Sequence, residues 1–510
     1  MRSFLQRSYQ KLWFLIPGSL AFGVYYHTLA PGVVGFDSAE LVTGAHTLGI
    51  VHPTGYPLYL MLAKLFSLLP SGGIAFRVNL FSACCAAITV SLLSIVLHQL
   101  SDRRSVALFA GGVLAFVISF WQMAVVAEVY TLHLLFLAGE MALLLRWVRC
   151  GQIRWLDLFV FIYALSLTNH VSSILFAPAF AWFVLRKAGF RRIMRRVPLY
   201  LLLGVIGMTP YLYLPLRQMA QPTLDYVSSY YNIDMRTLSG LWWMISGQAY
   251  HFFAFSYDLG GYLREAAGFV HLLVRNVTLV GIALGLLGLV VSIRKQMHLY
   301  IALPLLFVTY TLFYIGYGVV DKATMFLPSY FTWVIWMAVG LNALMEWGGA
   351  RHPFYDGQLP GLLFPAGMQV LAALFVAAFL SLNWSWADMS EAYGPEIFAE
   401  QVLVTIDEEA FIMGEWSSAV ILEYYQTVEG VRPDVEIFNR SRFQVAQYYA
   451  LLNDAMPPAQ AVETVYAFEE AWISSVASDR PVYSVEYDPR LATSYEYQPV
   501  GTVFQLIPLK

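Results

Sequence analysis

Long apolar runs separated by short polar stretches follow one another from residue 12 to residue 381. An apolar run of about 20 residues crosses a bilayer as a helix, which satisfies its own backbone hydrogen bonds in lipid. We place about eleven such spans, near residues 12–30, 74–98, 105–121, 124–146, 155–169, 171–186, 198–215, 269–293, 299–318, 329–346 and 361–381. The apolar segment 56–70 is shorter, which is typical of a re-entrant or interfacial helix. The pattern predicts a polytopic α-helical membrane protein.

The pattern changes after about residue 381. Short runs such as "QVLVTI", "SAVILEYY", "DVEIF" and "RPVYSVEY" alternate there with helical and turn signals, as in a small α/β domain. We therefore expect a transmembrane domain over 1–381 and a soluble α/β domain over 382–510. The transmembrane domain includes a first outer loop at 31–73 and a long outer loop at 216–268.

Charge gives the orientation. Only 12% of residues are charged, against about 25% in soluble domains. Lys and Arg gather at one set of span ends, which the positive-inside rule assigns to the cytoplasm, so the N-terminus is expected there and segment 382–510 outside. The first span is interpreted as a retained anchor, and the bacterial inner or plasma membrane is the expected location. The basic ends hold Arg2, Arg7, Lys11, Arg103, Arg104, Arg146, Arg149, Arg154, Arg186, Lys187, Arg191, Arg192, Arg195, Arg196, Arg294, Lys295 and Arg351.

Other compositional features exclude some classes. Segment 382–510 has 20 acidic and 6 basic residues, which favours a soluble surface that repels anions. The chain has no Lys/Arg-rich tract of the kind that binds nucleic acid. The three cysteines are placed for neither a disulfide framework nor a metal site.

Four ionisable residues cluster in the first outer loop, in "FDSAELVTGAHTLGIVHPTGYP": Asp37, Glu40, His46 and His52. One interpretation is structural: Asp37 and Glu40 form a capping box for a helix over about 38–49, which "HPTGYP" ends. The other is functional: a carboxylate at the outer interface acts as a general base or binds a cation. The two interpretations are compatible, because a rigid helix also positions a catalytic group.

Further polar groups fall at outward-facing span ends. Arginine binds phosphate bidentately, so Arg77 and Arg217 are candidates to hold a lipid phosphate. For both, and for Lys322, the alternative is an interfacial anchor or a helix C-terminal cap. The full set of candidate substrate-binding residues is His46, His52, Tyr56, Arg77, Glu128, Tyr130, His170 and Arg217.

Several motifs together resemble a known family. They are "FDSAELVTGAHTLGIVHPTGYPLYLMLAKLF", "RVNLFSA", "EVYTLHLLFLA", "LSLTNH", "GQAY" and "YYQTVEGVRPDVEIFNRS". They resemble domain-of-unknown-function 2723, the family of transmembrane protein 260-like protein O-mannosyltransferases, within the GT-C glycosyltransferases. The family often has Gly where this chain has Ala39, Pro at Thr54 and Asn at His133.

The resemblance implies a GT-C-type fold and an inverting glycosyltransferase. Such an enzyme moves a hexose, here expected to be mannose, from a polyprenyl-phosphate carrier to a hydroxyl, expected to belong to a protein Ser or Thr. It implies Asp37 as the catalytic base and Glu40 as a second carboxylate. No metal or nucleotide cofactor is required, although a divalent ion is compatible with the chemistry. Two other classes stay open from the residues alone: a lipid or polysaccharide transporter or flippase, and a non-enzymatic envelope assembly protein.

Overall fold

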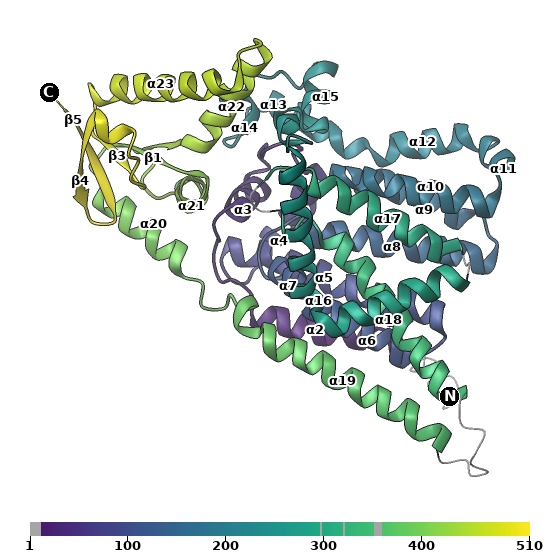
Figure 1. Ribbon diagram of the computed structural model, residues 1–510. Helices are drawn as coiled ribbons and strands as arrows, with labels where there is room; N and C mark the ends of the chain where they lie inside the picture. Colours follow the sequence, from purple (N-terminus) through teal and green to yellow (C-terminus); the bar gives the residue numbers. More distant parts are fainter. Residues whose placement is uncertain (1–11, 296–297, 320–321, 351–359, 510) are drawn as a thin grey trace.

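The computed structural model describes residues 12–295, 298–319, 322–350 and 360–509. Helices make up the first three quarters of the chain (Figure 1). Their bounds are α2 (Leu15–His27), α3 (Asp37–Thr47), α4 (Pro57–Ser67), α5 (Ile74–Ser101), α6 (Arg104–Phe116), α7 (Ile118–Ala124), α8 (Tyr130–Cys150), α9 (Arg154–Leu167), η1 (Val171–Phe176), α10 (Ala177–Ala188), α11 (Phe190–Met194), α12 (Val197–Gly207), η2 (Thr209–Leu212), α13 (Tyr213–Met219), α14 (Tyr226–Tyr230), α15 (Leu238–Ser246), η3 (Gln248–Phe253), α16 (Leu259–Lys295), α17 (His298–Ile315), α18 (Leu327–Ala350) and α19 (Pro360–Ala387).

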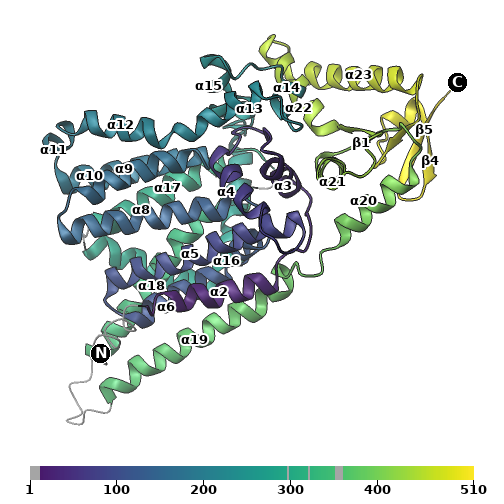
Figure 2. The ribbon, with the colours of Figure 1, turned by 180° about the vertical axis from the view of Figure 1, so that it is seen from behind.

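The long helices form a bundle in which α5 packs against α2, α6 and α8, and α16 packs against α18. Glycines bring α16 and α18 together: a Cβ on Gly288 would lie 1.8 Å from the Trp336 carbonyl oxygen, and one on Gly340 would lie 2.2 Å from that of Leu284. Small residues allow this backbone approach where lipid provides no hydrophobic force between helices. Helix α19 runs along one edge of the bundle (Figures 1 and 2).

The number of spans stays a prediction. Within the described residues, six helices are long and apolar enough to cross a membrane, or up to eight if each of two bent pairs counts as one span. The bent pairs are α6 with α7, at 68°, and α12 with the helices that follow it, at 41°. The other predicted spans fall on shorter helices: α2 has 13 residues and α9 has 14, while 302–315 is the short apolar stretch of α17.

The last part of the chain carries a five-stranded sheet of order β2-β1-β3-β5-β4. Strands β1, β2 and β3 are parallel, with Phe411 opposite Glu436 and Val482, whereas β5 is antiparallel to β3 and β4. Helices connect the parallel strands, as parallel strands require a crossover. The elements are α20 (Gly394–Thr405), β1 (Phe411–Gly414), α21 (Trp416–Thr427), β2 (Glu436–Asn439), α22 (Arg440–Asn453), α23 (Pro458–Ala477), β3 (Val482–Ser484), η4 (Leu491–Thr493), β4 (Tyr495–Val500) and β5 (Val503–Pro508).

Residues 394–508, which carry the sheet and are called the sheet region below, pack against segment 31–73. Helix α21 packs against α3. The backbone N–H of Phe36 donates to Ser417 Oγ at 3.3 Å, and a Cβ on Gly35 would lie 2.0 Å from that oxygen. The loop is also tied to the bundle, because Asn79 Nδ2 donates to the carbonyls of Ala30 and Gly32, both at 3.0 Å.

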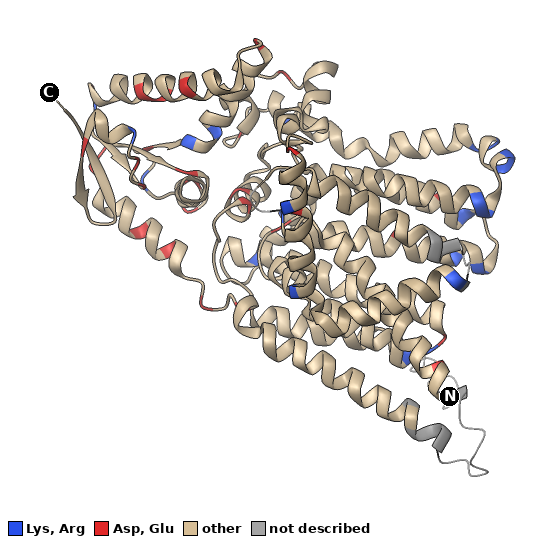
Figure 3. Ribbon diagram, in the orientation of Figure 1, with Lys and Arg blue, Asp and Glu red and all other residues tan. Residues whose placement is uncertain are grey.

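Lys and Arg are concentrated away from the sheet. Figure 3 shows them at the turn that joins α10, α11 and α12, at the end of the bundle opposite the sheet. That turn contains Arg186, Lys187, Arg191, Arg192, Arg195 and Arg196. The predicted basic residues Arg2, Arg7, Lys11 and Arg351 lie outside the described residues.

Candidate functional site

Helix α3 begins differently from the predicted capping box. Its N-cap is Phe36, with φ 60°, and no side chain caps the first turn. Asp37 is therefore the first helical residue rather than the cap, and Glu40 lies inside the helix, so that prediction was wrong. The reason is that the Glu40 carboxylate points inward to His52 and accepts a hydrogen bond from its backbone N–H at 3.1 Å.

A tight turn brings His52 back over α3. The Gly55 N–H donates to the His52 carbonyl at 2.8 Å, and Gly55 has φ 81°, a conformation that favours glycine. A Cβ there would also lie 2.8 Å from Met244 Cε and 2.9 Å from Leu214 Cδ2. The "HPTGYP" sequence, predicted to end a helix and to supply the site residues His52 and Tyr56, thus places an imidazole beside two carboxylates.

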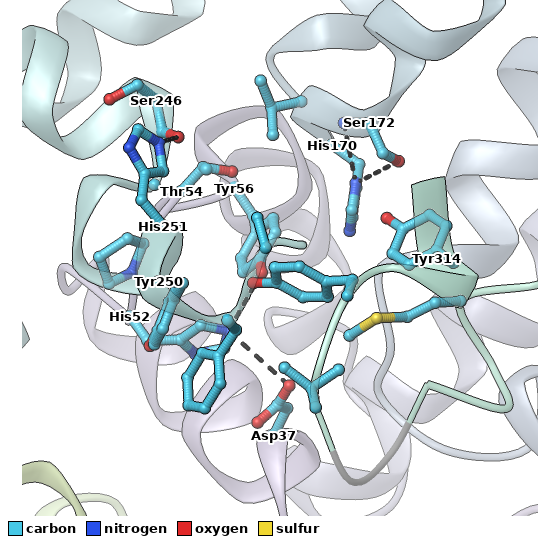
Figure 4. Close-up of a pocket in the computed structure, with 18 of the residues that line it drawn as sticks. Asp37, His52, Thr54, Tyr56, His170, Ser172, Ser246, Tyr250, His251 and Tyr314 are labelled. Carbon is cyan, nitrogen blue, oxygen red and sulfur yellow. Dashed lines mark hydrogen bonds and ion pairs between the residues drawn. The ribbon is translucent and has the colours of Figure 1, made fainter. Parts of the chain in front are cut away.

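Asp37, His52 and Glu40 form a line of alternating charge, and Figure 4 shows its Asp37–His52 end. Glu40 Oε2 lies 2.5 Å from His52 Nδ1, and Asp37 Oδ2 lies 3.7 Å from His52 Nε2. The Glu40 side chain is fully buried and that of His52 is 8% exposed, whereas that of Asp37 is 29% exposed. Asp37 is therefore the member of the line that a substrate can reach.

The charges of the two buried groups follow from their contacts. Burial lowers the pKa of His52, but the Asp37 and Glu40 carboxylates raise it, to about 9 overall. Burial raises the pKa of Glu40, but His52 and Arg442 hold it below its usual value. At neutral pH, Asp37 therefore faces an imidazolium ion on its inner side.

Asp37 and His52 border a cavity of about 600 Å³, within the range of pockets that hold small molecules. Its lining comes from the start of α3, the turn after it, η1, η3, the end of α17 and the sheet region. Five predicted site residues line it: Asp37, His52, Tyr56, Tyr130 and His170. Asp37 thus opens into a cavity at the end of the helical bundle.

His170 presents a fixed hydrogen-bond donor to this cavity. Its Nδ1 accepts from the backbone N–H of Ser172 at 3.2 Å and lies 2.7 Å from Ser172 Oγ. A nitrogen that accepts from a backbone N–H carries no proton, so the proton of the neutral ring is on Nε2. Figure 4 shows that side of the ring turned to the cavity. Behind it, Ser172 Oγ contacts Tyr310 at 3.0 Å and His133 at 3.4 Å.

The two predicted phosphate-binding arginines lie elsewhere. Arg77 donates to the carbonyls of Ser67, at 2.7 Å, and Gly72, at 3.0 Å, just after α4. Arg217 donates to the carbonyls of Leu48, at 2.5 Å, and Thr47, at 3.3 Å, at the end of α3. Both bind the unpaired carbonyls at a helix C-terminus, so the capping alternative describes their placement and neither lines the cavity.

The remaining predicted residues are behind the cavity wall. The carbonyl of His46 accepts a bond from Lys64, and its ring is not in the cavity. Glu128 exchanges backbone hydrogen bonds with Ser82 Oγ and is also outside the lining. Glu40 is behind His52. Lys322 forms an ion pair with Glu265 at 2.5 Å.

Part of the lining was not predicted. Trp416, Ser441 and Val445 contribute from the sheet region, and Tyr226 and Tyr250 from the long outer loop. The family motifs "GQAY" and "IFNRS" end on two of these residues, Tyr250 and Ser441, but they carried no assigned role. Within the part of the chain that the structure describes, no group of three or more His, Cys, Asp and Glu side chains is arranged to hold a metal ion.

Comparison with known proteins shows a similarity to one family. Residues 37–192, which include α3, the turn after it and His170, match the family "Protein O-mannosyl-transferase TMEM260 N-terminal domain". The matched residues make up about a third of the chain. It is 27% identical over 471 residues to "Protein O-mannosyl-transferase TMEM260" of Mus musculus, a match that covers 85% of this chain and 63% of that protein. It is 22% identical over 560 residues to "Protein O-mannosyl-transferase tmem260" of Dictyostelium discoideum, covering 96% and 65%. The chain thus spans less than two thirds of these relatives' length.

Solved structures show the fold. ArnT from Cupriavidus metallidurans bound to undecaprenyl phosphate superposes with a TM-score of 0.61 at 13% identity, covering 97% of both chains. Its apo form gives a TM-score of 0.55 at 12% identity, covering 98% of both chains. The predicted α-helical integral membrane fold with a C-terminal sheet is therefore confirmed, and it is a fold that the chain shares with ArnT.

Proposed function

We propose that the protein is an inverting glycosyltransferase that moves a hexose, expected to be mannose, from a polyprenyl-phosphate carrier to a protein Ser or Thr hydroxyl. The observation that carries this proposal is the Asp37 carboxylate, partly exposed in a cavity and backed by the buried His52–Glu40 pair. The names of the relatives support the same reaction, and the ArnT structure that shares the fold is bound to a polyprenyl phosphate.

In this mechanism, Asp37 accepts the proton of the acceptor hydroxyl as its oxygen attacks the sugar's anomeric carbon. The bond between that carbon and the phosphate oxygen breaks, and the lipid phosphate leaves from the opposite face, which inverts the configuration. A general base of this kind contributes about 10²–10⁴-fold to the rate. His52 and Glu40 form the buried ion pair behind Asp37.

The departing phosphate needs hydrogen-bond donors. Since Arg77 and Arg217 are engaged with helix carbonyls and both ring nitrogens of His52 face other side chains, we assign this role to two other donors within the cavity, His170 Nε2 and the Tyr56 hydroxyl. The carrier phosphate is itself the leaving group, so the proposed reaction needs no nucleotide and no metal. Turnover that is unaffected by EDTA is the expected result.

We further propose that the sheet region, as a separate domain over 382–510, and the cavity face the extracytoplasmic side. The concentration of Lys and Arg at the opposite end of the bundle supports this orientation (Figure 3). A bacterial inner or plasma membrane stays our prediction for the location.

The test is transfer by the purified full-length protein in lipid nanodiscs. Labelled polyprenyl-phosphate mannose and a Ser/Thr-containing peptide should give labelled peptide, and GDP-mannose in place of the lipid should not. Asp37→Asn should lower kcat by about 10²–10⁴-fold at unchanged expression. Asp234→Asn, which alters an exposed outer-loop carboxylate paired with Arg236, is the matched control and should retain turnover. Near-normal turnover by Asp37→Asn would exclude Asp37 as the base.

A further inference from the structure

Arg442, on α22 of the sheet region, contacts helix α3, which carries Asp37 and Glu40. Its Nη1 donates to both oxygens of Glu423 on α21, at 2.7 and 2.8 Å. Its Nη2 donates to Glu40 Oε1 on α3 at 3.4 Å, across 402 positions of sequence. The Arg442 side chain is 3% exposed. A guanidinium buried this deeply holds its two carboxylate partners in a fixed geometry.

Aromatic rings fix the plane of this guanidinium. Its central carbon lies 5.0 Å from the ring centroid of Trp416, 5.1 Å from that of Tyr226 and 5.9 Å from that of Tyr230. Trp416 begins α21, whereas the two tyrosines belong to the long outer loop. Trp416 and Tyr226 also pack against the His52 ring, with centroids 5.7 and 6.3 Å away. Arg442 therefore stands where three separate segments meet the imidazole of the site.

The charges around it alternate without a break. In order they are Asp37, His52, Glu40, Arg442 and Glu423, and each neighbouring pair is an ion pair. Glu40 is fully buried and divides its two oxygens between the two cations: Oε2 faces His52, and Oε1 accepts from Arg442 and from the His52 backbone N–H. A carboxylate held from two sides has one orientation, whereas one held by His52 alone can turn with it.

We propose that Arg442 is a positioning residue through which the sheet region completes the reaction site, by fixing Glu40 and thereby holding His52 beside Asp37. Its kinetic consequences rest on the proposed transferase function; its structural consequences do not. On this view, formation of the cavity and docking of the C-terminal region are one event, since Trp416 both lines the cavity and stacks on Arg442.

The matched control is two residues away on the same helix. Arg440 is equally buried and pairs with Glu469, Asp488 and Glu415, all of which lie in the sheet region. All the ion-pair partners of Arg440 are in the sheet region, whereas Arg442 also pairs with Glu40 on α3. Comparison of the two arginines therefore separates damage to the C-terminal fold from loss of the contact with Glu40.

The structural experiment is amide hydrogen exchange, followed by mass spectrometry, on the full-length protein in nanodiscs. Arg442→Met should raise exchange in peptides covering 37–56, including the His52 amide that donates to Glu40, by about tenfold. Arg440→Met should raise exchange only in peptides from 408 onward. Arg442→Lys keeps the charge but loses the separate nitrogens that bond Glu423 and Glu40, and much of the stacking. Its exchange rate over 37–56 should lie between those of Arg442→Met and wild type. Unchanged exchange over 37–56 in a folded Arg442→Met or Arg442→Lys protein would overturn the proposal.

The kinetic experiment adds a second readout. Arg442→Met should lower kcat by about tenfold or more with the donor KM within about threefold, and Arg442→Lys should partly restore kcat. An equal loss of kcat in Arg440→Met would show that Arg442 acts only through the C-terminal fold and would overturn the positioning role. Wild type and all variants could fail to transfer sugar while Arg442→Met, and not Arg440→Met, still raises amide exchange over 37–56. That result would refute the proposed function and support the positioning role of Arg442.

Discussion

The charge on His52 can be tested by removing its nearest anion. Glu40→Gln keeps the size of the side chain but eliminates the carboxylate that lies 2.5 Å from Nδ1. Asp37 remains 3.7 Å from Nε2, the Tyr56 hydroxyl lies 3.1 Å from the same nitrogen, and Arg442 opposes a proton on the ring. Burial then favours the neutral ring, and we expect the pKa of His52 to fall.

The magnitude follows from the pKa of about 9 for His52 in the folded protein. The usual value is about 6.5, so the folded protein holds this proton about 3 kcal/mol more tightly than the unfolded chain does. Because the folded pKa is the higher one, this stabilisation is fully present below pH 6.5. It decreases as the pH rises and is lost above about pH 9. Glu40, whose pKa is lowered, stays ionised throughout this window and adds no slope there.

The assay is the free energy of unfolding, from denaturant titration in detergent, at several pH values between 6 and 10. Wild type should exceed His52→Gln most at pH 6, and the difference should shrink by about 3 kcal/mol by pH 10. The difference between wild type and Glu40→Gln should shrink in the same direction but by less, because Asp37 still favours the protonated ring.

A difference between wild type and Glu40→Gln that stays constant over this pH range would refute the reasoning. It would mean that His52 is neutral in the folded protein and that its contact with Glu40 is an ordinary hydrogen bond. The conclusion that Asp37 faces a protonated His52 would then be wrong.

Three further predictions concern neighbouring residues. His170→Ala should raise the donor KM by about tenfold, measured by initial rates, because the fixed Nε2 donor is lost. Arg217→Met should lower the free energy of unfolding by about 1–2 kcal/mol and leave the donor KM unchanged, because Arg217 caps α3; a large rise in KM would restore it as a phosphate ligand. Gly55→Ala should lower the free energy of unfolding by about 1–3 kcal/mol, because its positive φ and the contacts with Met244 and Leu214 exclude a Cβ.

The sequence alone was sufficient for features that depend on local chain pattern. Apolar runs located the helices of the bundle, and the scarcity of charge drew attention to Asp37, Glu40 and His52 in the first outer loop. These three do come together, because the turn at Gly55 returns the chain over α3 within about one helix length. The prediction that Asp37 and Glu40 cap α3 was wrong, because the Glu40 carboxylate binds the buried imidazole of His52 instead of the first turn of its own helix.

Features that depend on distant segments could not be predicted. Arg442 and Glu40 are 402 positions apart in the sequence. Local sequence patterns do not show which residue of the α/β segment contacts which residue of the loop before the second span. The same limit explains Arg77 and Arg217. Because basic residues are rare on the side predicted to face outward, these two arginines were predicted to bind a phosphate. In the fold, each lies beside the C-terminus of a helix and donates to its carbonyls.

The most direct test of the proposed reaction site is a cryo-electron microscopy structure of the wild-type protein with a polyprenyl-phosphate hexose analogue that cannot transfer. We predict sugar density in the cavity between Asp37 and His170, with the lipid phosphate on the far side of the anomeric carbon from the Asp37 carboxylate. Sugar bound outside this cavity, or an Asp37 side chain turned away from the anomeric carbon, would contradict it.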